Sequence, residues 1–230
     1  LFASSPEDLA SGEESLGYVG TAQFELGRLQ LGEDEGISDA VQGFFRSSAS
    51  TFSSLTKRFP NAKDAATWQF QSGESYYASL AYERAVAEYE KVHQNYPESE
   101  SAPESLYAIS TCYSMLADSA GDEEESAKWR SKLFETNEVL VGKYPQSSYA
   151  GNAMVNLANK LYNEGSAPEI ENSERIRLYK LAVEKYRVAA EVAGIDAETK
   201  ASAGLYMRET QTALAYYEYT TAGENLTTAR

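Results

Sequence analysis

Apolar residues recur at intervals of three and four along almost the whole chain of 230 residues. This spacing places apolar side chains on one face of an α-helix, whereas a half-buried strand would alternate at every second residue. One such stripe consists of Tyr82, Ala85, Val86, Tyr89, Val92 and Tyr96. Charged residues occupy the other side of the same segment, as a solvated helix face requires. The pattern predicts an all-α protein.

The helical pattern is interrupted three times by an aromatic residue followed by proline. These pairs are Phe59-Pro60, Tyr96-Pro97 and Tyr144-Pro145, and the prolines are 37 and 48 residues apart. A frame of a small, an aromatic and an apolar residue also returns along the chain. It occurs as Ser48-Phe52-Leu55, Ala85-Tyr89-Val92 and Ala182-Tyr186-Ala189, and more weakly as Leu133-Asn137-Leu140. A frame and a break that return together indicate stacked helix hairpins, because one hairpin alone cannot bury its apolar face.

The breaks divide the chain into four expected hairpins and a terminal helix. We expect the hairpins at about 13–58, 62–97, 102–145 and 148–192, and the last helix at about 197–220. Together these elements form one repeat domain at 13–220. An N-terminal extension at 1–12 and a C-terminal tail at 221–230 flank that domain.

Composition excludes several classes of function. The chain has 35 Asp and Glu against 20 Lys and Arg, a net charge of −15, so a nucleic acid backbone would be repelled. A single histidine and a single cysteine do not supply a His/Cys zinc site or an internal disulfide, and we expect no metal and no cofactor. No apolar run is long enough to cross a membrane. Tyrosine is abundant, with 17 residues.

The segment 65–97 resembles the tetratricopeptide repeat family. Gly73 and Tyr76 match the pattern of the first helix of that repeat, and Ala85, Tyr89 and Pro97 match the second. The endings YPES and YPQS resemble the subtype of bacterial outer-membrane assembly lipoproteins and Tol-Pal accessory proteins. The resemblance implies a right-handed superhelical solenoid, a non-catalytic interaction scaffold, and a location in the bacterial periplasm or outer-membrane-associated envelope, or outside the cell.

Two residues depart from the repeat pattern, and the third hairpin carries an acidic insertion. Gln69 and Ser72 stand where the family prefers apolar residues, and the insertion spans 118–129. The acidic run lacks the spaced ligands of a calcium loop, so it is better explained as the solvated start of a helix.

The resemblance also implies a binding groove, because the first helices of successive hairpins line the concave face in this family. Carried over by register, the groove residues are Phe70, Glu74, Tyr77, Tyr107, Thr111, Ser114, Asn152, Val155, Asn159 and Tyr162. Aromatic rings give contact area and amides hydrogen-bond a peptide backbone, so the expected partner is another polypeptide. The alternative is that the rings pack between hairpins as core.

A second hypothesis is self-assembly, because an open solenoid has two ends that continue one another in a filament or large complex. The tyrosines of the last helix form the candidate assembly surface: Tyr206, Tyr216, Tyr217 and Tyr219. The last three of these cannot share one narrow helical stripe, so we expect some of them to be exposed. An enzyme is the least favoured class, because no motif identifies catalytic residues.

Overall fold

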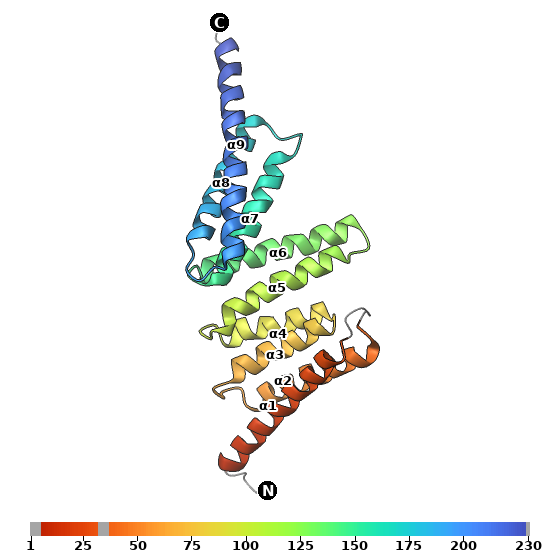
Figure 1. Ribbon diagram of the computed structural model, residues 1–230. Coiled ribbons are helices and arrows are strands. Elements are labelled where there is room, and N and C mark those ends of the chain that lie inside the picture. The colour runs from red at the N-terminus through yellow and green to blue at the C-terminus, as the bar shows by residue number, and fades with distance from the viewer. Residues whose placement is uncertain (1–5, 32–36, 229–230) are drawn as a thin grey trace. The chain divides into compact units, whose positions relative to one another are not determined.

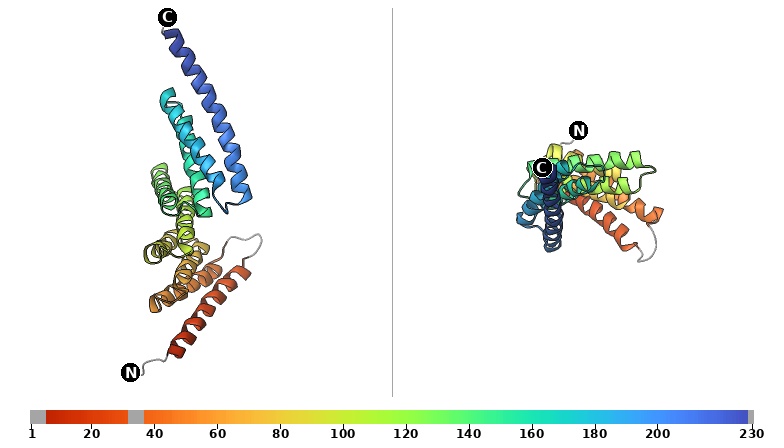
Figure 2. Two further views of the ribbon diagram at one scale, coloured as in Figure 1. Left: turned by 90° about the vertical axis from the view of Figure 1, so that its left-hand side faces the viewer. Right: turned by 90° about the horizontal axis from the view of Figure 1, so that it is seen from above.

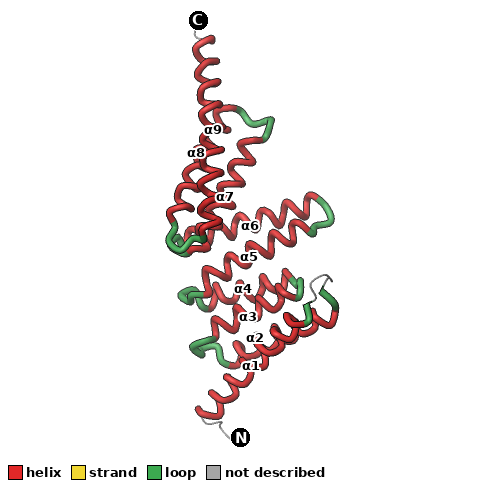
Figure 3. Tube along the Cα trace, viewed as in Figure 1, coloured by secondary structure: helices red, strands yellow, loops and turns green. Residues whose placement is uncertain are grey.

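The computed structural model describes residues 6–31 and 37–228. All the regular secondary structure in these ranges is helical, which confirms the all-α prediction (Figures 1 and 3). The described helices are α1 (Pro6–Leu29), α2 (Asp39–Arg58), α3 (Ala65–Ala78), α4 (Tyr82–Asn95), α5 (Ser101–Asp118), α6 (Glu123–Lys143), α7 (Ser148–Ser166), α8 (Asn172–Glu191) and α9 (Ala197–Thr228). Consecutive helices pack in adjacent pairs, consistent with a tetratricopeptide-like solenoid.

The chain divides into two compact units, Leu1–Leu133 and Phe134–Arg230. In the first unit each of α1 to α4 packs against the helix that follows it, and α3 also contacts α5. Tyr113 of α5 stacks on Trp129 of α6, with ring centroids 5.7 Å apart. In the second unit α8 packs against both α7 and α9, and α9 also contacts α7 (Figure 2).

The two outer helices extend beyond the positions that the sequence pattern predicts. α1 begins at Pro6, within the expected extension, because proline suits the first turn of a helix. α9 continues to Thr228, through the expected tail. Residues 1–5 of the extension and 229–230 of the tail lie outside the described residues.

Each aromatic-proline pair ends a helix in the same way. The backbone N–H of the aromatic residue donates to the carbonyl four residues earlier in all three cases, at 2.8–2.9 Å. Proline cannot continue this ladder because it has no N–H. The Tyr96 hydroxyl also donates to the Pro60 carbonyl at 3.0 Å, which links the ends of two successive hairpins.

The recurring frame forms the core. Ala85, Tyr89 and Val92 of α4 are fully buried, and the equivalent residues of α2 and α8 are buried as well. In the weaker copy, Asn137 and Leu140 of α6 are also fully buried.

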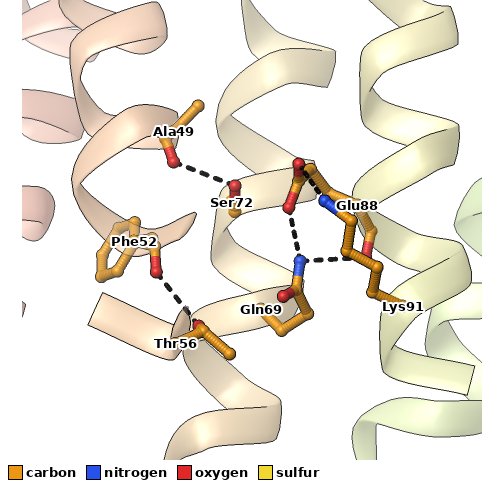
Figure 4. A network of polar contacts seen from close by, with 7 residues as sticks. All are labelled: Ala49, Phe52, Thr56, Gln69, Ser72, Glu88 and Lys91. Carbon is orange, nitrogen blue, oxygen red and sulfur yellow. Dashed lines mark hydrogen bonds and ion pairs between the residues drawn. The ribbon is translucent and has the colours of Figure 1, made fainter. Parts of the chain in front are cut away.

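The two departures from the repeat pattern are buried and hydrogen-bonded (Figure 4). The Gln69 amide donates to the Glu88 backbone carbonyl at 3.1 Å and to its carboxylate at 2.6 Å. The Ser72 hydroxyl donates to the Ala49 carbonyl at 2.9 Å. Lys91 completes the network with an ion pair to Glu88 at 2.7 Å. A buried polar side chain costs little when it is satisfied in this way.

Candidate functional site

The structure places six of the sequence-predicted groove residues on α3 and α5, all half-buried. We call them the α3–α5 surface: Phe70, Glu74, Tyr77, Tyr107, Thr111 and Ser114. Half-buried side chains are held by neighbours while part of each remains accessible to a partner.

The three α3 residues of this surface pack within their own hairpin. The Phe70 ring lies 5.3 Å from the Tyr89 ring, measured between centroids. The Tyr77 ring meets Tyr82 edge to face at 5.4 Å. Glu74 accepts a hydrogen bond of 2.5 Å from the Tyr89 hydroxyl. Contacts to α4 therefore fix these side chains.

The α3 and α5 parts of the surface lie close together. The pKa of Tyr77 is raised by burial first, and then by the proximity of Tyr82, Cys112, Glu74 and Tyr107. Cys112 and Tyr107 belong to α5, whereas Glu74 and Tyr77 belong to α3. The surface thus spans two successive hairpins, whose helices α3 and α5 contact each other.

Burial sets the protonation of this region. It raises the pKa of Glu74, the hydrogen bond from Tyr89 opposes that rise, and the like charge of Glu104 adds to it. Burial and then Glu74 raise the pKa of the Cys112 thiol to about 12. A thiol with so high a pKa stays protonated at neutral pH and is a poor nucleophile.

The four predicted groove residues of α7 have different environments. Val155 is 8% exposed and belongs to the core of the second unit, so little of it is available to a partner. Asn152 is half-buried, and its side-chain oxygen is buried with no hydrogen-bond partner among the described residues. Asn159 and Tyr162 line a cavity of about 280 Å³.

That cavity lies within the second unit, and we call it the α7–α9 cavity. Its lining residues are Asn159, Tyr162, Asn163, Tyr186, Tyr206, Glu209 and Thr210. Tyr186 is buried and its hydroxyl donates to the Asn159 side-chain oxygen at 2.5 Å. The sequence indicated Tyr186 only as a packing residue, and nothing in the sequence pattern indicated Glu209.

The four tyrosines of the predicted assembly surface are distributed around α9. Tyr216 and Tyr219 are 62% and 81% exposed, whereas Tyr217 is half-buried. Tyr206 borders the α7–α9 cavity. The expected exposure of some of these tyrosines is therefore confirmed.

Tyr217 is held by Arg175, a residue that no sequence pattern indicated. Arg175 of α8 is 8% exposed and donates 2.7 Å hydrogen bonds to the carbonyls of Gly165 and Ala167. Its guanidinium carbon lies 4.5 Å from the centroid of the Tyr217 ring. The cation therefore satisfies carbonyls at the end of α7, where the helix dipole is negative, while its face contacts α9.

The described residues also bear on other chemistries. They contain no group of three or more His, Cys, Asp and Glu side chains placed to hold a metal ion. Among their helices, none combines the length and the apolar composition that a membrane crossing requires.

Comparison with known proteins identifies the family. Curated proteins give no match. The family model YfiO, described as an outer membrane lipoprotein, matches residues 34–167, more than half of the chain. This match confirms the resemblance of the repeat to bacterial outer-membrane assembly lipoproteins. It also confirms the expected location in the cell envelope, associated with the outer membrane. The family is non-catalytic and works through protein interactions in outer-membrane assembly. The chain belongs to the YfiO outer membrane lipoprotein family.

Proposed function

We propose that this chain is a scaffold that binds a polypeptide partner on the α3–α5 surface. The observation that carries the proposal is the packing of α3 against α5, which brings half-buried rings, hydroxyls and a carboxylate of two successive hairpins onto neighbouring helices. Rings of this kind supply contact area at low entropic cost, and the hydroxyls supply hydrogen bonds to a peptide.

The fixed positions of these side chains also favour binding. Glu74 and Tyr77 are already held by Tyr89 and Tyr82, so little side-chain freedom remains to be lost when a partner docks. The net charge of −15 favours a partner with a neutral or basic segment.

A double substitution tests the proposal. Tyr77→Ala with Tyr107→Ala removes both rings, and we expect recovery of the partner from an envelope extract to fall at least tenfold, since truncated interface anchors commonly cost about 1–2 kcal/mol or more each. Thermal unfolding of the variant checks that it remains folded. Recovery equal to that of the native chain would overturn the proposal.

The matched control is Tyr18→Ala with Tyr76→Ala. It also removes two tyrosines from the first unit, but Tyr18 is exposed on α1 and Tyr76 lies under Arg84 of α4. Recovery of the partner is expected to stay at the native level. Equal losses in both double variants would assign the effect to stability.

Self-assembly through α9 is the second candidate, because Tyr216 and Tyr219 expose large aromatic rings on the same helix. Sedimentation velocity over a range of concentrations tests it. Higher-order species that disappear in Tyr216→Ser with Tyr219→Ser would support this candidate. A monomer at every concentration would exclude it.

A further inference from the structure

The α7–α9 cavity combines three tyrosine rings with one carboxylate. The rings are Tyr162 of α7, Tyr186 of α8 and Tyr206 of α9, and the carboxylate is Glu209 of α9. Three of these four residues lie beyond residue 167, where the family match ends.

The rings are held in place by contacts within the second unit. Tyr186 and Tyr206 lie 6.0 Å apart between centroids at an interplanar angle of 44°. Tyr162 is stacked on Tyr179 at 5.4 Å. Burial and the nearby Tyr206, Tyr162 and Glu209 raise the pKa of Tyr186 to about 12, so the buried phenol remains neutral. The cavity therefore presents aromatic rings that contacts within the unit hold in place.

Glu209 is the only charged residue in the lining of this cavity, and it has no hydrogen bond or ion pair among the described residues. Two cations of the same unit have other partners. Arg187 pairs with Glu184 and Glu191, and Lys180 pairs with Glu218. None of the ion pairs or cation–π contacts of the described residues involves Glu209 or the three rings.

We propose that the α7–α9 cavity holds the arginine or lysine side chain of a partner polypeptide. Aromatic faces attract cations through their quadrupole, and Glu209 adds a carboxylate at the rim. The cavity volume of about 280 Å³ lies just below the roughly 300–1,000 Å³ of pockets for drug-sized ligands, which suits one side chain. The Asn163 amide, which has no described partner, is available to a peptide group beside that side chain.

This proposal rests on the proposed function, since it gives a polypeptide partner a second point of contact and states the chemistry of that contact. The two are separable in experiment because the α3–α5 surface belongs to the first unit and the cavity to the second.

Short peptides test the cavity directly in the full chain. The probes are acetyl-Ala-Arg-Ala-amide, its lysine counterpart and its glutamine counterpart, titrated at low salt into protein with ¹³C-labelled tyrosine rings. We expect the two basic peptides to shift the ring signals of Tyr162, Tyr186 and Tyr206, and the glutamine peptide to leave them unchanged. Equal binding of the glutamine peptide, or no response to the basic peptides, would overturn the proposal.

Substitutions of residues that line the cavity test whether the carboxylate and the rings bind the peptide. Glu209→Gln and Tyr206→Leu should each weaken binding of the arginine peptide about two- to fivefold. Matched controls are Glu198→Gln, at an exposed position of α9, and Tyr18→Leu, at an exposed position of α1, both outside the cavity. Unchanged affinity in Glu209→Gln would overturn the role of the carboxylate, and equal losses in the controls would overturn the assignment to the cavity.

Two further arms separate the possible outcomes. Guanidinium ion alone is expected to bind more weakly than the arginine peptide, and equal affinity would overturn a polypeptide as the source of the cation. The Tyr77→Ala with Tyr107→Ala variant should bind the peptide as the native chain does. Native partner recovery by that variant, together with intact peptide binding, would refute the α3–α5 surface while leaving the cavity proposal in place.

Discussion

The ring of Tyr89 lies directly against the backbone of Gly73, so that a Cβ atom added to Gly73 would overlap the ring. This contact brings α3 and α4 together at the point where the Tyr89 hydroxyl reaches Glu74. The repeat residues Gly73 and Tyr89 therefore pack the hairpin and also position a carboxylate of the α3–α5 surface.

Gly73→Ala is expected to destabilise the protein. Tyr89 is fully buried and has no room to move, so overpacking should cost about 1–3 kcal/mol, and the better helix propensity of alanine offsets about 1 kcal/mol of that. Denaturant unfolding measures the change. Gly43→Ala in α2 is the control, because its new Cβ would meet nothing within 4 Å and it should raise the free energy of unfolding by up to about 1 kcal/mol. Equal stability gains in both variants would contradict the close contact.

Glu74 should give the stability of the protein a specific dependence on pH. Its pKa is raised in the folded state, so its contribution to stability is fully present below the unfolded pKa and is lost as the pH rises through the folded pKa. We expect the native chain to lose stability relative to Glu74→Gln as the pH rises from the unfolded-state pKa of Glu74 to its folded-state pKa. Unfolding of both proteins at a series of pH values measures the difference.

Tyr89→Phe sharpens the same test. The hydrogen bond from the Tyr89 hydroxyl opposes the rise in the pKa of Glu74, so its removal should raise that pKa further. The Tyr89→Phe protein should then continue to lose stability up to a higher pH than the native chain does. Its stability is compared with that of the double variant Tyr89→Phe with Glu74→Gln. A difference that does not change with pH would show that Glu74 ionises equally well in both states.

The helices and much of the core could be predicted because their determinants are local. The small-aromatic-apolar frame and the aromatic-proline breaks lie within single helices, and a repeat shows them several times. The residues Gln69 and Ser72 were harder to interpret, because their burial is satisfied by Glu88 and Ala49 on neighbouring helices. Such a partner depends on tertiary packing, which periodicity does not specify.

The candidate sites were predictable to different degrees for the same reason. Register within the repeat identified Tyr77 and Tyr107, since each lies on the first helix of a hairpin. It also placed Val155 in the groove, although that side chain is largely core. The cavity needs α9 beside α7 and α8, so no local pattern could bring Tyr206 and Glu209 to Asn159.

Arg175 of α8 gives the last prediction, because it links α8 to the end of α7 and to α9. Arg175→Met removes the donors to the carbonyls of Gly165 and Ala167 and the cation beneath Tyr217, and we expect a loss of about 2–3 kcal/mol in the free energy of unfolding. Amide hydrogen exchange should also accelerate around Tyr217, because that part of α9 loses one of its contacts with α8. Arg177→Met is the matched control: the same change at an exposed position of α8, where only a surface pair with Glu174 is lost, should leave stability and exchange nearly unchanged. Equal effects of the two substitutions would mean that Arg175 acts through helix propensity or net charge, and not as the contact between α7 and α9.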